Sequence, residues 1–289
     1  MKLPLWRKAL LSVQMIAAVA FFTTACERIV DPDLPSTAHA FSPPLVYDKW
    51  WKMVESCSGV TRPLADVTWF GVSGSSFQLQ KELVTGYWSA GSNRVVLADS
   101  SRLDGAVVRH EMLHALVRQP GHPRSAFLEK CAGLVSCTKE CVADAGPASQ
   151  DYLSYPAASM DSFDISIQVL PNPPSLSVDG GVFSVVVSAR NRTSHPVSLS
   201  LPIINGVPAA PFAFEIRALS APAAAIGGIL NLSDPSVTTF AAGETKRQYF
   251  DFNIGSVIRN RTIAPAAYRV TGWYATRSVA LSPVVIGPP

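Results

Sequence analysis

Two histidines four residues apart, with a glutamate beside the first, are the residues of this chain best suited to chemistry. They form the sequence His110-Glu111-Met112-Leu113-His114. Residues four apart share one face of a helix, so both imidazoles can bind one metal ion while Glu111 acts as a general base toward water. The chain has five His and eight Glu, from which about 0.002 such motifs are expected by chance. The motif therefore predicts metal-dependent hydrolysis.

The residues around the motif predict a buried helix. Residues 104–118 carry apolar side chains on most sides, Asp104 is a suitable N-cap, and Pro120-Gly121 follows as a stop signal. Two histidines and a carboxylate inside a buried helix need polar partners, and a metal ion supplies them. The alternative is a pair of core histidines that local hydrogen bonds satisfy.

A third metal ligand has to come from outside the motif. A catalytic zinc ion usually has three protein ligands and one open position. His122 is the first candidate, because a turn after Pro120-Gly121 can bring it back toward the motif. Glu129 and Cys131 are the alternatives, and His122 can also be read as a surface loop residue.

The stretch from His110 to Phe127, HEMLHALVRQPGHPRSAF, resembles the SprT-like proteins and related zincin metallopeptidases. In those proteins a third His follows HExxH closely and precedes a short helix with an aromatic residue, here Phe127, one place later than in the pattern. The spacing differs from the metzincin HExxHxxGxxH. The resemblance implies an α+β zincin-like domain in which His110, His114 and His122 bind one Zn²⁺ ion. It also implies peptide-bond hydrolysis by a zinc-bound water that Glu111 activates.

The same resemblance implies a place for the substrate. In zincins an edge strand lies beside the cleft and pairs with an extended peptide, a role that would fall to residues 94–98. The residue that stabilises the transition state stays open, with Tyr87, Tyr152 and Tyr155 as candidates.

The first 25 residues predict export. Three basic residues and no acidic ones precede or flank an apolar run over residues 9–22, which is short for a membrane span. Small residues then precede Cys26, an arrangement that resembles a bacterial lipobox. The resemblance implies a lipid anchor on Cys26 that holds the protein to a membrane of the bacterial cell envelope, on the periplasmic face or at the outer membrane. An ordinary cleaved signal and an uncleaved anchor are the alternatives.

Charge and composition exclude several classes of function. The chain has 24 Lys and Arg against 21 Asp and Glu, and removal of residues 1–25, with three basic side chains, leaves 21 of each. A neutral mature chain gives no electrostatic case for binding nucleic acid. The 48% hydrophobic and 16% charged residues exclude a charge-rich disordered protein.

The remaining cysteines predict disulfides. With Cys26 assigned to lipid, an even set is left in an exported chain, which favours two bonds. Of the three possible connectivities we favour Cys57–Cys131 with Cys137–Cys141. A cysteine-rich metal site is the rival interpretation, and the absence of a CxxC pair disfavours it.

Apolar spacing divides the mature chain into two domains. A Pro-rich tether over residues 26–44 precedes a predicted catalytic domain over residues 45–145, and a linker over residues 146–162 follows it. Residues 163–289 alternate apolar and polar side chains and predict an all-β Ig-like sandwich. The predicted elements are a helix over 45–58, strands over 67–72, 77–79, 83–88 and 94–98, the motif helix over 104–118, and about seven strands beyond residue 163.

Together these features predict a lipid-anchored zinc metallopeptidase that acts on a peptide or protein substrate. Two other hypotheses remain. In one, a closed zinc site only stabilises the first domain, and the Ig-like domain binds glycan, protein or cell wall. In the other, the second domain is an inhibitor-like module that governs the first.

Overall fold

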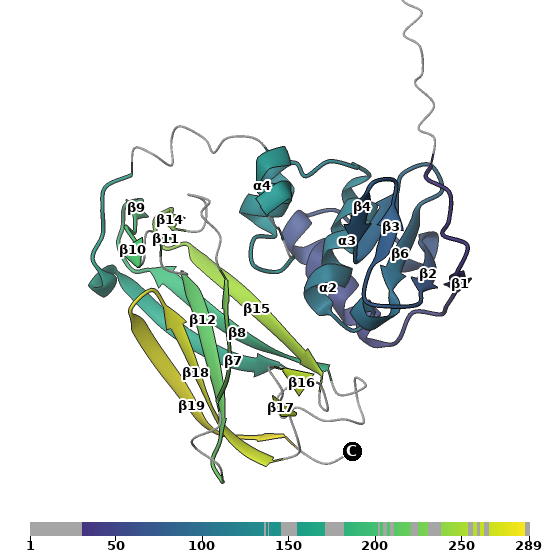
Figure 1. The fold of residues 1–289 in the computed structure, drawn as a ribbon. Helices are drawn as coiled ribbons and strands as arrows, with labels where there is room; N and C mark the ends of the chain where they lie inside the picture. Colours follow the sequence, from purple (N-terminus) through teal and green to yellow (C-terminus); the bar gives the residue numbers. More distant parts are fainter. Residues whose placement is uncertain are drawn as a thin grey trace, which may run out of the picture. The chain divides into compact units, whose positions relative to one another are not determined.

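The computed structural model describes residues 31–135, 137, 139–145, 155–170 and 182–286, with gaps in the last range at 202, 205–206, 209–210, 221–224, 231–237, 254–256, 259–260 and 263–265. The predicted signal segment, Cys26 and Tyr152 lie outside the described residues. The chain divides into two compact units, Met1–Asp31 and Pro32–Pro289. The second unit is mixed α and β, with more strand than helix (Figure 1). Among the described residues, no helix is long and apolar enough to cross a membrane.

A four-stranded sheet underlies the motif helix. Its order is β1-β2-β6-β5, with β2 and β6 parallel and with β1 and β5 antiparallel to their neighbours. The strands are β1 (Ala38–Ala40), β2 (Thr68–Val72), β5 (Gly86–Ser89) and β6 (Arg94–Ala98). β1 lies within the stretch over residues 26–44 that the sequence predicted as a tether, so part of that stretch belongs to the sheet.

The edge-strand prediction for residues 94–98 is wrong. Those residues form β6, which pairs on both sides; the edge strands of this sheet, as described, are β1 and β5, and β5 is the neighbour of β6. The predicted strand over 83–88 divides at Thr85: β4 (Glu82–Val84) pairs with β3 (Phe77–Leu79) in a hairpin, whereas β5 turns to pair with β6. Because β6 is fully apolar on both faces from Val95 to Ala98, its composition is that of a central strand.

Helices pack on one face of this sheet. The predicted helices at 45–58 and 104–118 are confirmed as α2 (Val46–Ser58) and α3 (Gly105–Val117). The carboxylate of Asp104 caps α3 by accepting the backbone N–H groups of Ala106 and Val107 at 3.0 and 3.3 Å. The shorter elements are η1 (Leu64–Asp66), η2 (Asp99–Ser101), the π-helical η3 (Ser125–Lys130), α4 (Lys139–Asp144) and η4 (Met160–Ser162).

Both predicted disulfides are present. Cys57–Cys131 joins the last turn of α2 to the end of η3, and Cys137–Cys141 closes a short loop into α4. Cys131 is therefore unavailable as a metal ligand, and the cysteine-rich metal site is excluded. Two disulfides indicate an oxidising, extracytoplasmic location.

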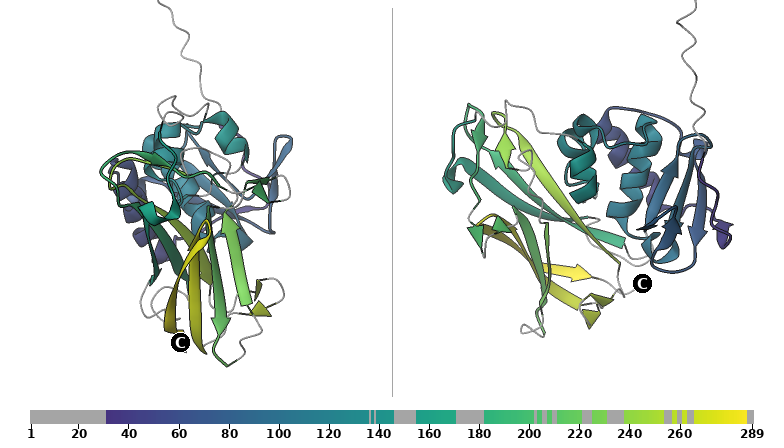
Figure 2. Two further views of the ribbon diagram at one scale, coloured as in Figure 1. Left: turned by 90° about the vertical axis from the view of Figure 1, so that its left-hand side faces the viewer. Right: turned by 45° about the horizontal axis from the view of Figure 1, so that its top comes forward.

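The region beyond residue 155 is built from two larger sheets around one core. One sheet has the order β15-β8-β7 and the other β13-β12-β18-β19. Both contribute apolar side chains to a shared hydrophobic cluster, and Figure 2 shows the sheets facing each other. The strands are β7 (Phe163–Leu170), β8 (Val182–Asn191), β12 (Phe212–Ala218), β13 (Ala225–Leu230), β15 (Thr245–Asn253), β18 (Ala266–Tyr274) and β19 (Arg277–Ile286).

Three short ladders complete the described strands of this region. They pair β9 (Val197–Ser198) with β14 (Thr239–Phe240), β10 (Ile203–Ile204) with β11 (Val207–Pro208), and β16 (Val257–Ile258) with β17 (Arg261–Thr262). β13, with the sequence AIGGIL, was not predicted, because its two glycines interrupt the strand pattern.

Candidate metal centre

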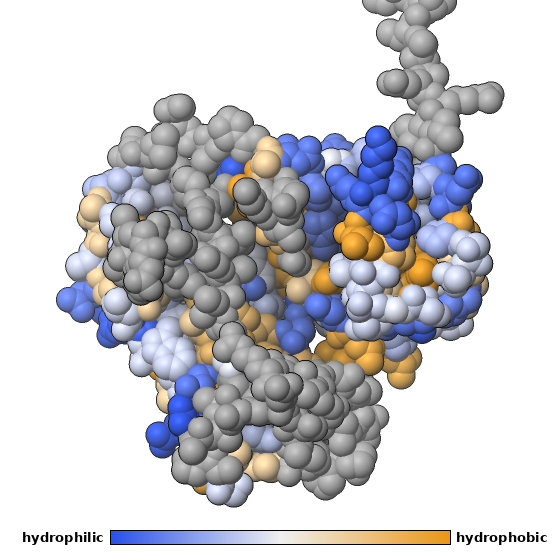
Figure 3. Space-filling model, in the orientation of Figure 1, coloured by the Kyte–Doolittle hydropathy of each residue, from blue (hydrophilic) through white to orange (hydrophobic). Residues whose placement is uncertain are grey.

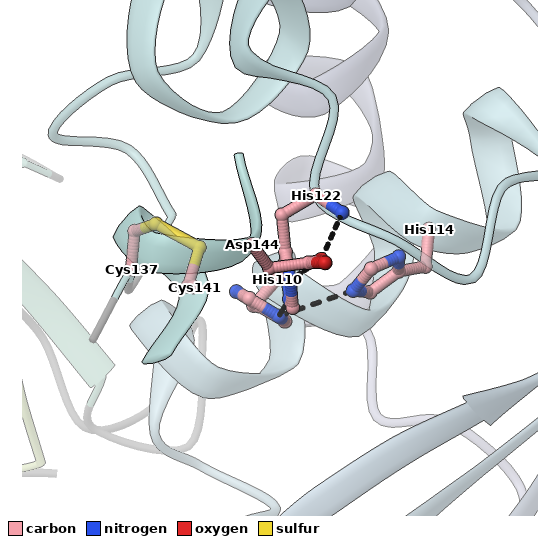
Figure 4. The surroundings of a disulfide bond; sticks show 6 residues. All are labelled: His110, His114, His122, Cys137, Cys141 and Asp144. Carbon is pink, nitrogen blue, oxygen red and sulfur yellow. Dashed lines mark hydrogen bonds and ion pairs between the residues drawn. A yellow bond between two sulfur atoms is a disulfide. The ribbon is translucent and has the colours of Figure 1, made fainter. Parts of the chain in front are cut away.

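The structure brings His110, His114 and His122 together. The Nε2 atom of His110 lies 3.1 Å from that of His122 and 3.2 Å from that of His114 (Figure 4). One ring nitrogen from each of the three residues lies within 4.8 Å of the others, close enough to hold one metal ion. Helix geometry accounts for the pair on α3, and the turn after the helix brings in the third.

The outer nitrogens of two rings are fixed by acceptors. His114 Nδ1 lies 2.8 Å from the carbonyl oxygen of Gln119, and His122 Nδ1 lies 2.8 Å from the Asp144 carboxylate. Neither acceptor has a proton to give, so each Nδ1 donates and each Nε2 keeps its lone pair. A proton on His110 Nε2 can serve only one of its two contacts. A cation placed between the three Nε2 atoms would accept all of their lone pairs. Hydrogen bonds from Nδ1, such as those to Gln119 and Asp144, commonly orient the histidine ligands of metal ions.

Burial also keeps His114 neutral. Its side chain is buried, and desolvation lowers the pKa of His114 to about 4, although the hydrogen bond to Gln119 acts in the opposite direction. The Trp88 ring stacks parallel to the imidazole at 6.2 Å between centroids. A neutral imidazole is the form that ligates a metal.

Asp144 is a site residue that the sequence did not reveal. It accepts both the backbone N–H of His122, at 2.9 Å, and the ring Nδ1–H. These hydrogen bonds hold the pKa of Asp144 below its usual range. Only a general rule could have pointed to Asp144 in the sequence. Metal-binding histidines usually donate a hydrogen bond to a carboxylate, and Asp144 is one of few acidic residues near His122.

The ring of Phe127 packs against all three imidazoles. Its fully buried ring lies with its centroid 5.1, 4.7 and 5.0 Å from those of His110, His114 and His122. The aromatic residue after the third histidine, on which the zincin resemblance partly depends, therefore packs against all three rings.

Glu111 lies against strand β5 and lines the same cleft as His110 and His122. Its side chain is buried, and a Cβ placed on Gly86 would lie 3.1 Å from its Oε1 atom. Desolvation raises the pKa of Glu111 to about 8, opposed by a hydrogen bond from the backbone N–H of Trp88. The carboxylate is thus held between the motif helix and the edge strand.

A cleft of about 520 Å³ opens onto the site. Its described lining includes His110, Glu111 and His122 on one side and residues 82–86 on the other. Leu83 of the β3–β4 hairpin is 73% exposed beside it, and Figure 3 shows hydrophobic residues at the surface around this hairpin. The cleft thus joins the metal-binding face to an apolar rim.

The other candidates lie away from this cleft. Glu129 lines a separate cavity together with Lys130 and Lys246, so it is not among the converging ligands. Tyr87 packs with the apolar cluster on the sheet face opposite Trp88, as the alternation of β5 requires. Tyr155 is absent from the described lining of the cleft.

Comparison with known proteins adds no relative. No family model matches the chain, and no curated protein matches it closely enough to count as related. Similar solved structures include the alkylpurine DNA glycosylase AlkC of Pseudomonas fluorescens bound to DNA with an abasic site analogue (13% identity, TM-score 0.28, 42% of this chain and 30% of that one). A mutant β-glucosidase of Listeria innocua in complex with laminaribiose is another (14%, 0.24, 43% and 16%). The chain spans less than a third of either protein, and such low TM-scores imply nothing about fold or function.

Proposed function

We propose that this protein is a zinc-dependent peptidase. The observation that carries the proposal is the convergence of the three Nε2 atoms next to a cleft that His110, His122 and the buried Glu111 line. Two nitrogens that each bind a tetrahedral zinc ion at roughly 2.0–2.1 Å are about 3.4 Å apart. The separations of 3.1 and 3.2 Å are close to that value, and a set of imidazoles suits zinc.

The donor set favours a catalytic site over a closed structural one. Among the described residues, the metal-binding group has three members, and the two nearest carboxylates are engaged elsewhere. Asp144 accepts from His122, and Glu111 faces Gly86. Three protein ligands with an open fourth position are typical of catalytic zinc.

Each residue has a distinct part in the proposed reaction. A bound zinc ion would polarise the substrate carbonyl and lower the pKa of a water molecule. Glu111 would accept a proton from the attacking water at its carboxylate and return it to the leaving amine. Asp144 and the Gln119 carbonyl would hold the rings of His122 and His114 in orientation, and Trp88 and Phe127 would exclude water from behind them.

The edge strand supports a peptide as substrate. Among the described strands β5 pairs only with β6, so the backbone groups of its other edge, apart from the Trp88 N–H that Glu111 accepts, can hydrogen-bond an extended chain of any sequence. Gly86 of this strand lines the cleft together with Glu111. A peptide paired with β5 would therefore pass close to the three histidines, and the exposed Leu83 would contact an apolar side chain.

We propose in addition that the chain is lipidated on Cys26 and anchored to the cell envelope. The interpretation of residues 163–289 as an Ig-like sandwich belongs to the same proposal. It is supported by two facing sheets around a shared core, as an Ig-like fold requires.

Substitution of Glu111 tests the proposed activity. Glu111→Gln should retain wild-type zinc content, because the residue is not a ligand, and lose hydrolysis of a mixed library of quenched fluorescent peptides by at least about 100-fold. Glu129→Gln makes the same change outside the cleft and should retain both properties. Wild-type rates in the Glu111 variant, or failure of the zinc-loaded wild type to cleave any library member or unfolded protein, would refute a peptidase.

A further inference from the structure

Arg109, next to the first motif histidine, is a fully buried cation. Its side chain has 0% exposure, and its guanidinium makes paired contacts with Asp251 at 2.7 and 3.2 Å. The Nε–H donates to the carbonyl oxygen of Leu134 at 2.7 Å. An arginine cannot lose its charge in a protein, so Asp251 is the counter-ion that makes this burial tolerable.

Asp251 belongs to strand β15, far along the sequence. Its side chain is 3% exposed and also accepts a hydrogen bond from Ser184 of β8 at 2.6 Å. The carboxylate is therefore held in place by the β-rich region and presented to the motif helix. The Arg109–Asp251 ion pair is bidentate and buried, and the Ser184 hydroxyl donates a third hydrogen bond to its carboxylate, which is the geometry of a strong and specific contact.

The backbones approach closely around this ion pair. The N–H of Tyr249 in β15 donates to the carbonyl oxygen of Gly133 at 3.0 Å. A Cβ on Gly133 would lie 1.9 Å from the carbonyl oxygen of Arg247, and one on Gly105 would lie 2.9 Å from the Cγ atom of Asp251. A side chain at Gly133 would clash with the backbone of β15, and one at Gly105 would press on the Asp251 side chain, so the loop after η3 and the start of α3 both pack against β15.

The β15 contact and the cleft occupy different faces of α3. Successive helical residues are about 100° apart, so Arg109 and His110 leave the helix in different directions. The described lining of the cleft comes from residues 82–86, 107–122 and Cys141, with no described residue beyond 155. This arrangement disfavours the hypothesis of an inhibitor-like module that covers the cleft.

We propose that the β-rich region is a structural part of the metal centre, and that Asp251 is a positioning residue which holds α3, and with it His110 and His114, in register through Arg109. This inference depends on metal binding by the three histidines and not on peptidase activity. Loss of the carboxylate would leave a buried guanidinium without a counter-ion, and α3 would have to shift or rotate to relieve it.

Zinc affinity of the full-length chain tests the proposal. Asp251→Asn removes the charge, and Ser184→Ala removes only the hydrogen bond that orients it. We expect zinc affinity, measured by chelator competition, to fall about 10- to 100-fold in the first variant and about threefold in the second, in line with losses seen for partners of metal ligands. The visible absorption band of the Co²⁺-loaded Asp251 variant should shift, because it reports ligand geometry.

Two controls separate positioning from general stability. Asp164→Asn removes a carboxylate from an exposed pair with Arg192 and should change neither property. Val270→Ala opens a cavity in the core of the β-rich region, and should lower the melting temperature without changing zinc affinity at a temperature where the variant is folded.

The outcomes divide clearly. Wild-type zinc affinity and cobalt spectrum in Asp251→Asn would overturn the proposal, as would an equal loss of affinity in Val270→Ala at the same change in melting temperature. If Asp251→Asn does not fold, Ser184→Ala decides in its place. Hydrolysis is not measured, so a protein that binds zinc but cleaves nothing would contradict the proposed function and leave this inference intact.

Discussion

The two halves of the candidate metal centre are built in different ways. His110 and His114 are supplied by one helix whose apolar faces are buried against a sheet and against α2. His122 lies outside that helix and is oriented by Asp144 of the short helix α4, whose carboxylate is 54% exposed. Core packing fixes the first half, whereas a few polar contacts and a disulfide fix the second.

Because of this difference, we expect substitutions in the two halves to affect the stability of the fold and the affinity for a metal ion differently. Changes to the helical half should unfold the domain or abolish metal binding, because they disturb the core. Changes to the loop half should weaken metal binding while the fold survives. The variants below test that separation, from the largest expected effect to the smallest.

Removal of the Cys57–Cys131 disulfide should have the largest effect. The bond joins residues 74 apart and ties α2 to η3, so the chain-entropy model gives a loss of about 4 kcal/mol in unfolding free energy for the Cys57→Ala, Cys131→Ala double variant. Chemical denaturation measures it. The Cys137–Cys141 bond spans four residues and should contribute about 2 kcal/mol by the same model. Equal losses from the two double variants would contradict the expectation that the bond to α2 stabilises the fold more than the bond in the loop next to His122.

Replacement of a histidine ligand comes next. His114→Ala and His122→Ala should each weaken zinc binding by more than the roughly 10- to 100-fold loss that accompanies removal of a ligand's hydrogen-bond partner. Only His114→Ala should also lower the melting temperature of the protein stripped with chelator, because His114 is buried whereas the His122 side chain is 22% exposed. Bound zinc and thermal unfolding are measured on the same samples. Wild-type zinc content in His122→Ala would exclude it as the third ligand.

The carboxylate behind His122 should have an intermediate effect. Asp144→Asn keeps one acceptor for the ring Nδ1–H but removes the charge, so zinc affinity should fall about 10- to 100-fold. The fold should be unaffected, because the side chain is more than half exposed. Asp161→Asn, on the short helix η4 outside the cleft, serves as the matched control. An unchanged zinc affinity in Asp144→Asn would show that His122 needs no such support.

Sequence patterns predicted the helical half well because each of its constraints is local. The four-residue spacing of His110 and His114 places them on one face, and Asp104 caps the helix through atoms two and three residues away. Cysteine parity predicted two disulfides, and the connectivity favoured among the three possible ones is the one present. Strands β7 and β18 followed from the alternation of apolar and polar side chains.

The errors and omissions concern contacts between distant segments. Whether residues 94–98 lie at the sheet edge depends on how the chain turns after Thr85, where β5 begins and pairs with β6. Asp144 contacts His122, which is 22 positions away in the sequence, and Asp251 contacts Arg109, which is 142 positions away. A single sequence shows the acidic residue and the basic or imidazole group, but the fold alone shows which of them meet.

The smallest expected effect is at Gly86, where the edge strand meets the catalytic glutamate of the proposed reaction. A Cβ there would lie 2.9 Å from Leu97 Cδ2 and 3.1 Å from Glu111 Oε1. Gly86→Ala should therefore displace the carboxylate by a few tenths of an ångström and lower kcat about 3- to 10-fold, well below the roughly 100-fold loss from a misplacement of 1 Å. Zinc affinity should stay at the wild-type value, because no histidine is touched. The double variant Gly86→Ala, Leu97→Val removes the contact with Leu97 and leaves that with Glu111, so kcat should stay low if the glutamate is what the added methyl group displaces. Recovery of kcat in the double variant would instead locate the effect in the packing between β5 and β6.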